Sequence, residues 1–147
     1  VYGGRNRIQK PNLLLMLEHL EIPLIYIENA ASFLKEEPEG KISGLLVTVD
    51  CQYGSGNVMR LPAEKVAVVD HHRPETGNIE LGEINSHVGS CATLVWRLLT
   101  EAGYRVEDKR LGTALYYGLF MDTNQFAELY NPLDQDMRQA CVRKGIN

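Results

Sequence analysis

Two short apolar runs, each ending in an aspartate, constrain the fold of this chain most. Residues 44–49 (GLLVTV) lead into Asp50, and residues 66–69 (VAVV) lead into the tripeptide Asp-His-His at 70–72. Short runs rich in valine are typical of strands that are buried on both faces of a parallel sheet. Open α/β sheets bind ligands at the carboxyl ends of such strands. The two runs therefore predict an α/β fold with its functional side chains at one edge of the sheet.

Helical patterns alternate with these and other predicted strands. Alternation of this kind predicts a three-layer, doubly wound, mostly parallel sheet of Rossmann-like type, with helices on both faces. The expected helices are 12–20, 30–37, 90–102, 111–122 and 133–143, and the expected strands are 23–27, 44–49, 65–69 and 79–84.

Composition narrows the class of protein. The chain has 147 residues, of which 44% are hydrophobic and 23% charged, and a net charge of −4. These values predict one globular domain and argue against a general nucleic-acid-binding surface. Cys51, Cys91 and Cys141 form no paired motif, so a reducing, cytoplasmic setting fits best. No stretch reaches the roughly 18 apolar residues of a membrane span, and no membrane partner is expected.

The polar residues that follow the two apolar runs suit metal or acid–base chemistry. Asp50 and Asp70 would lie at the same sheet edge, and His71 and His72 follow at once. One carboxylate with two imidazoles can bind a divalent metal or catalyse phosphate ester cleavage. The alternative is that each aspartate caps a turn and that both histidines are solvated.

A third carboxylate, Asp122, follows the apolar turn at 118–121. An ionised carboxylate needs compensation where it is buried, and a helix C-terminus is already electronegative. A bound metal ion would remove both objections. The alternative is an exposed aspartate in a loop.

Residues 88–93 begin a predicted helix with small and hydroxyl side chains. The free N–H groups of a helix N-terminus at Gly89 and Ser90 suit a phosphate. An ordinary cap by Ser90 is the alternative. His87 precedes this turn and could contact a substrate, although a lone histidine in a loop is more often simply exposed.

Four segments in order carry a family resemblance: VTVDCQ at Asp50, VAVVDHHRPE, HVGSCATLVWRLL, and GLFMDTNQF at Asp122. With them, the chain resembles the DHH phosphoesterases, which include RecJ-type exonucleases, nano-RNases, family II pyrophosphatases and exopolyphosphatase-related proteins. Residues 1–24 also look like the segment that follows the first motif in the exopolyphosphatase-related branch.

The resemblance implies a role for each matching residue. Asp50 would bridge two divalent ions, usually Mn²⁺ with Mg²⁺ as the alternative, and His71 and Asp122 would be further metal ligands. Asp70 and His72 would be the catalytic pair, in which Asp70 orients the histidines and His72 lies against the substrate phosphate. The residues expected around that phosphate are His72, Arg73, His87, Gly89 and Ser90.

Two parts of the family pattern are missing from the chain. The first motif, a histidine followed by Asp-x-Asp, is absent, because no histidine precedes His19 and no aspartate precedes Asp50. The C-terminal substrate domain is absent as well. Residues 1–147 are therefore expected to be a single DHH catalytic-type domain, taken as a fragment that binds manganese weakly and hydrolyses substrate poorly by itself.

The function expected of the full-length protein is manganese-dependent hydrolysis of phosphodiester or phosphoanhydride bonds. Its substrates would be short oligonucleotides, nucleotides or polyphosphate. The alternatives are a non-catalytic DHH-fold module that binds a nucleotide or a partner protein, and a generic doubly wound domain with an incidental Asp–His cluster. A homodimer is left open, because Trp96 and Tyr116 suit a core or an interface equally well.

Overall fold

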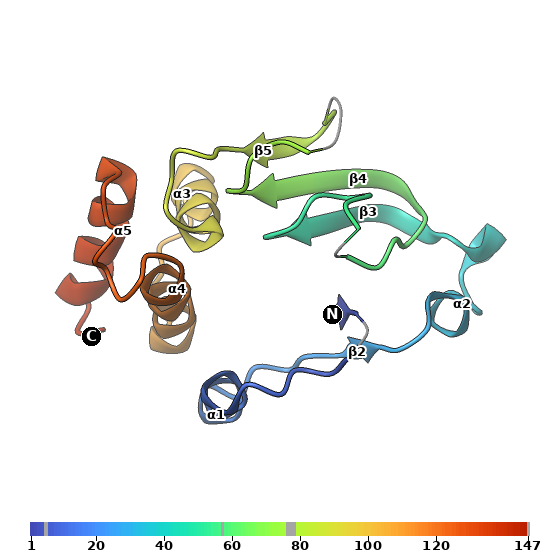
Figure 1. Cartoon of the computed structure of the whole chain (residues 1–147), viewed down its shortest axis with the longest axis horizontal. Coiled ribbons are helices and arrows are strands. Elements are labelled where there is room, and N and C mark those ends of the chain that lie inside the picture. Colours follow the sequence, from blue (N-terminus) through green and yellow to red (C-terminus); the bar gives the residue numbers. More distant parts are fainter. Residues whose placement is uncertain (5, 57, 76–78, 147) are drawn as a thin grey trace. The chain divides into compact units, whose positions relative to one another are not determined.

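The structure is a computed structural model, drawn in Figure 1. It consists of two compact units. The first unit comprises Val1–Val68 and Glu75–Gly82, and the second comprises Val69–Pro74 and Glu83–Asn147. The residues that the structure describes are 1–4, 6–56, 58–75 and 79–146.

The first unit begins with a small β-α-β element. Strand β1 (Tyr2–Gly3) pairs in parallel with β2 (Tyr26–Ile27), with Tyr2 opposite Tyr26. Parallel strands need a crossover connection, and α1 (Pro11–His19) lies within it. Strand β2 is shorter than the predicted strand 23–27. Its partner β1 has two residues, and the ladder pairs them with Tyr26 and Ile27.

A second helix in this unit, α2 (Ala30–Phe33), begins at Asn29, whose side chain accepts a hydrogen bond from the Ser32 N–H at 3.1 Å. The predicted helix 30–37 is wrong beyond Phe33. Glu37 has a ψ of 140° because a following proline disfavours the helical conformation, and the 3₁₀ turn η1 (Pro38–Gly40) comes next.

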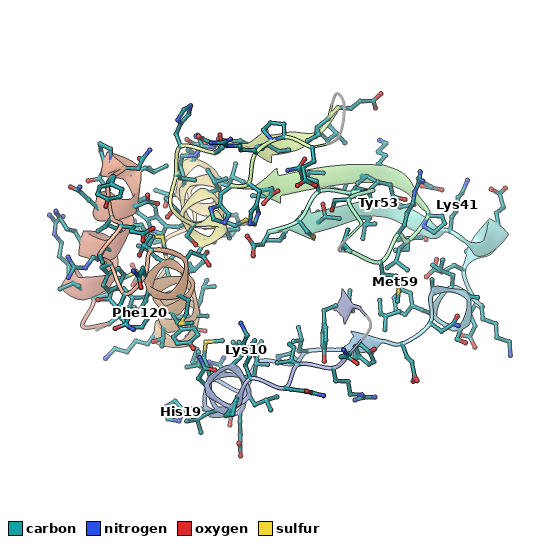
Figure 2. All side chains as sticks on the ribbon, viewed as in Figure 1. Lys10, His19, Lys41, Tyr53, Met59 and Phe120 are labelled. Atoms are coloured by element: carbon teal, nitrogen blue, oxygen red, sulfur yellow. The ribbon has the colours of Figure 1, made fainter. Side chains whose placement is uncertain are left out.

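The core of the first unit is formed by side chains from its strands, helices and loops. Ile27, Leu34 and Leu61 are its buried members. Met59, labelled in Figure 2, is partly buried and packs against them. This cluster joins the β-α-β element to the segments that precede β3 and β4.

A three-stranded sheet has the order β3-β4-β5, with β3 at Ile42–Val49, β4 at Ala63–Asp70 and β5 at Gly82–Ile84. The three arrows point the same way in Figure 1. The Asn85 N–H donates to the Asp70 carbonyl at 3.0 Å, just beyond β5. The predicted α/β class with parallel strands is confirmed, and the two apolar runs are strands. The expected burial on both faces is wrong for β3, because Leu45, Val47 and Val49, which alternate along one face of that strand, are exposed.

The second unit contains three helices that pack on one another: α3 (Cys91–Glu101), α4 (Lys109–Asp122) and α5 (Pro132–Arg143). Each agrees with its predicted range to within two residues. Trp96 and Tyr116 pack against the larger core of this unit and are partly buried. The buried residues of that core are Leu115, Leu119, Met137, Cys141 and Ile146, and a second cluster is formed by Val69, Val88, Cys91 and Leu94.

Side chains cap the N-termini of these helices. Ser90, Asp108 and Asn131 accept hydrogen bonds from N–H groups of the first turns of α3, α4 and α5. The Arg110 N–H lies 2.8 Å from Asp108 Oδ1, and this bond lowers the pKa of the Asp108 carboxyl. Among helices built from described residues, none has the length and apolar character required to cross a bilayer.

The three cysteines differ in exposure, which predicts a labelling order. Cys91 and Cys141 are each 3% exposed, whereas Cys51 is partly exposed. Burial also raises the pKa of the Cys141 thiol, so less of the reactive thiolate is present near neutral pH. We expect iodoacetamide to alkylate Cys51 at least about tenfold faster than Cys141, as followed by peptide mass spectrometry. Labelling in urea should remove the difference, and equal rates in the native protein would contradict the burial.

Candidate functional site

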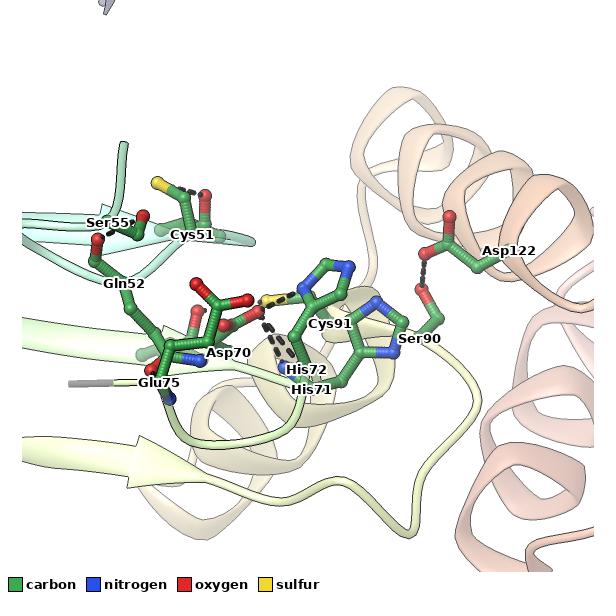
Figure 3. Close-up of polar contacts among 12 residues, drawn as sticks. Cys51, Gln52, Ser55, Asp70, His71, His72, Glu75, Ser90, Cys91 and Asp122 are labelled. Atoms are coloured by element: carbon green, nitrogen blue, oxygen red, sulfur yellow. Dashed lines mark hydrogen bonds and ion pairs between the residues drawn. The ribbon is translucent and has the colours of Figure 1, made fainter. Parts of the chain in front are cut away.

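Asp70, the last residue of β4, is a buried carboxylate at the start of the Asp-His-His turn (Figure 3). It is 1% exposed, and its Oδ1 accepts hydrogen bonds from the N–H groups of His71 at 2.8 Å and His72 at 3.3 Å. The same oxygen lies 2.8 Å from His72 Nδ1. A carboxylate bound to one ring nitrogen fixes the ring orientation and favours a proton on that nitrogen. Asp70 therefore holds the turn and leaves His72 Nε2 as the nitrogen that can act on a ligand.

The two imidazole rings lie next to each other. The ring centroids of His71 and His72 are 4.5 Å apart, with an angle of 57° between the planes. The His72 side chain is 58% exposed, and His71 is half-buried. Two adjacent imidazoles beside a buried carboxylate are suited to bind a metal ion or an anionic group.

Asp50 belongs to the first unit and follows β3 directly. Its φ is 61°, in the left-handed region that aspartate tolerates better than most residues. The loop after it is held by Gln52, which is 3% exposed and accepts the Glu75 N–H on Oε1 at 2.8 Å. Ser55 Oγ donates to the Gln52 carbonyl at 2.7 Å. A strained backbone at Asp50 is thus maintained by an ordered loop.

The donor types fit a divalent metal ion. Asp50 in the first unit offers a carboxylate oxygen, and His71 and His72 in the second unit each offer an imidazole nitrogen. One carboxylate oxygen and two imidazole nitrogens suit manganese and other divalent first-row ions. Among the described residues of the second unit, Asp122 is not grouped with the two histidines.

Asp122 instead lies at the end of α4 and contacts the start of α3. Ser90 Oγ donates to Asp122 Oδ2 at 2.6 Å, and Ser90 Oγ itself accepts the Ala92 N–H at 3.1 Å. Ser90 is completely buried and Asp122 is exposed. The structure therefore brings Ser90 and Asp122 together, and Ser90 is an N-cap of α3 (Figure 3).

Asp134, in the first turn of α5, is a site residue that sequence reasoning missed. It is completely buried, and its Oδ2 accepts the Gly89 N–H at 2.7 Å. Thr93 Oγ1 donates to its Oδ1 at 2.6 Å. Asp134 shares the buried face of α5 with Met137 and Cys141, at positions i, i+3 and i+7. That spacing is the signal that could have identified it.

The two remaining expected residues, Arg73 and His87, are exposed. His87 is held through its backbone: its N–H donates to Asn85 Oδ1 at 3.1 Å, and its carbonyl accepts from Asn131 Nδ2 at 2.9 Å. Arg73 follows the Asp-His-His turn directly and belongs, like His87, to the second unit.

Comparison with known proteins shows which fold this is. No family model matches the chain. The chain is similar in structure to an exopolyphosphatase-related protein from Bacteroides fragilis, with a TM-score of 0.59 and 20% sequence identity. The alignment covers 70% of this chain and 32% of the Bacteroides protein. It is also similar to a putative family II inorganic pyrophosphatase from Methanococcus jannaschii, with a TM-score of 0.66 and 20% sequence identity. That alignment covers 93% of this chain and 45% of the Methanococcus protein.

The chain has the fold of these two proteins and spans less than half the length of either. Exopolyphosphatase-related proteins and family II pyrophosphatases are two of the groups that the sequence of this chain resembles.

Proposed function

We propose that this chain is part of a metal-dependent hydrolase that cleaves phosphoester or phosphoanhydride bonds. The observation that carries the proposal is the Asp70 turn, in which a buried carboxylate orients His72 beside a second imidazole. The proposal is also supported by the fold that the chain shares with an exopolyphosphatase-related protein and a putative inorganic pyrophosphatase.

The proposed metal ligands are Asp50, His71 and Asp122, with Mn²⁺ as the ion and Mg²⁺ as the alternative. Strands β3 and β4 are neighbours and run the same way, and the carboxyl ends of such strands share one sheet edge (Figure 1). The donor types of Asp50 and His71 support a divalent ion. Such ions, when bound, would activate water and neutralise charge on the phosphate.

The residues proposed to lie around the phosphate are His72, Arg73, His87, Gly89 and Ser90, all in the second unit. Asp70 holds Nδ1 of His72, so Nε2 is the atom that would take up or transfer a proton, and in the imidazolium form it would donate to a phosphate oxygen. The Gly89 N–H is bonded to Asp134, and we therefore assign Gly89 a role in the shape of the turn. A Cβ at Gly89 would lie 2.7 Å from Thr123 Cγ2, so the turn requires glycine.

The finer parts of the proposal concern the whole protein. Its substrates would be polyphosphate, nucleotides or short oligonucleotides. The thiols of Cys51, Cys91 and Cys141 are not in disulfides, which supports a reducing, cytoplasmic location. The alternative is a non-catalytic module that binds a nucleotide or a partner protein on the same fold.

Metal titration tests the assignment of His71. We expect His71→Ala to weaken Mn²⁺ binding at least about tenfold in calorimetry, because it removes a ligand nitrogen. His19→Ala is the matched control, since His19 is an exposed histidine at the end of α1 and should not change the affinity (Figure 2). Equal binding by the wild type and both variants would refute the metal site.

Hydrolysis separates the enzyme from the binding module. Release of phosphate from pyrophosphate, polyphosphate or short oligonucleotides in the presence of Mn²⁺ would support the enzyme. Tight binding of Mn²⁺ and of these compounds with no turnover, in the full-length protein, would favour the non-catalytic module.

A further inference from the structure

We propose that Asp134 is a positioning residue, which fixes the Gly89–Ser90 turn at the start of α3 through hydrogen bonds and not through its charge. The importance of that turn for phosphate binding rests on the proposed function. The positioning itself rests only on contacts within the second unit.

Asp134 is placed to position and not to contact a substrate. It is completely buried, and both of its oxygens accept short hydrogen bonds, from Gly89 N–H at 2.7 Å and Thr93 Oγ1 at 2.6 Å. In the described part of the chain it has no ion-pair partner. Burying an ionised carboxylate without a cation is costly, and the N-terminal turn of α5 offsets only part of that cost. A buried carboxylate that destabilises the fold by its burial indicates that Asp134 has a specific structural role.

Asp134 helps to fix the Gly89–Ser90 turn, which is hydrogen-bonded to both α4 and α5. Asp134 holds Gly89 from α5, while Asp122 accepts the Ser90 hydroxyl from α4 at 2.6 Å. The fit around Gly89 is close, because a Cβ there would lie 3.1 Å from Asp134 Oδ2 and nearer still to Thr123. The backbone of the turn therefore has little freedom while Asp134 is in place.

The negative charge of Asp134 does not favour phosphate binding at the turn. A carboxylate behind an anion-binding turn repels the anion, so its benefit must come from geometry. An asparagine has the same shape: its Oδ1 can accept the Gly89 N–H, and its Nδ2 can donate to Thr93 Oγ1, which then acts as acceptor. Asp134→Asn should therefore keep the turn, and Asp134→Ala should release it.

Thr93→Val provides a matched control for lost stability. It removes the bond to Asp134 Oδ1 and nearly preserves volume, while it leaves the bond from Gly89 to Oδ2 in place. Both Thr93→Val and Asp134→Ala disturb the same buried carboxylate site. Only Asp134→Ala frees the turn.

The test combines amide hydrogen exchange with titration of inorganic phosphate in Mg²⁺, both read by NMR at Gly89 and Ser90. We expect Asp134→Ala to speed exchange of the Gly89 amide and to weaken phosphate binding, each at least about tenfold. Asp134→Asn and Thr93→Val should stay within about threefold of the wild type in both measurements. Equal effects of Asp134→Ala and Thr93→Val, or no effect of Asp134→Ala, would overturn the assignment.

The two proposals fail in different ways. If the wild type does not bind phosphate, the proposed phosphate site is wrong, and amide exchange still decides the role of Asp134. If Asp134→Ala does not fold, Asp134→Asn decides: fast Gly89 exchange in that folded variant would overturn the assignment.

Discussion

Replacing Gly82 with alanine is expected to lower the free energy of unfolding by about 3–5 kcal/mol. Gly82 has a φ of 108°, and a Cβ there would lie 1.9 Å from the Val68 carbonyl oxygen and 2.6 Å from the Val68 nitrogen. Both atoms belong to the backbone of β4, so no side-chain rotation can relieve the clash. Strand β5 would have to move away from β4, and the Val68 N–H would lose its 3.1 Å bond to the Leu81 carbonyl. Urea unfolding followed by circular dichroism measures the change.

Gly54→Ala is the matched control for this prediction. Gly54 also has a positive φ, of 91°, but nothing lies within 4 Å of the position its Cβ would take. Only the backbone strain acts there, which costs about 1–2 kcal/mol. Equal losses in the two variants would show that the clash with β4 does not determine the effect.

Asp70→Ala is expected to lower the free energy of unfolding by about 2–4 kcal/mol and to release the His72 ring. The substitution removes a buried acceptor and leaves the backbone N–H groups of His71 and His72 and the ring nitrogen of His72 without their shared partner. Chemical denaturation measures the stability, and ¹⁵N NMR of the His72 ring reports the loss of its fixed tautomer.

Asp70→Asn separates the shape of this residue from its charge. The amide oxygen can still accept from both N–H groups and from His72 Nδ1. We expect it to lose less than half as much stability as Asp70→Ala, since hydrogen bonds to a neutral acceptor are about half as strong. If Asp70→Ala were as stable as the wild type, the central place of Asp70 in the turn would be refuted.

The features that sequence reasoning predicted are those set by neighbouring residues. Strands β3 and β4 were predicted because their apolar runs are continuous, and α3 because Ser90 precedes an amphipathic pattern that ends before Gly103. The Asp-His-His turn is local as well, because Asp70 contacts the two residues that follow it.

The features that sequence reasoning missed depend on residues far apart in the chain. Asp134 and Gly89 are 45 positions apart, and although the spacing of Asp134 with Met137 and Cys141 places it on the buried face of α5, no local pattern identifies Gly89 as its partner. The positive φ of Gly82 likewise follows from the approach of Val68. The wrong extension of α2 has a local cause, the effect of Pro38 on Glu37, that the helical pattern outweighed.

The polar contacts among α3, α4 and α5 also determine which changes the second unit tolerates. Apolar cores accept volume-conserving exchanges, so Met137→Leu should leave Gly89 in place. Hydrogen bonds of 2.6 and 2.7 Å do not accept a slip of one residue, which advances a helix by about 1.5 Å. A single residue inserted between Asp134 and Met137 would therefore disrupt the turn, because it shifts Asp134 relative to the core residues Met137 and Cys141 even when every core side chain is unchanged. For protein engineering, the composition of this core is adjustable, and the length of the first turn of α5 is not.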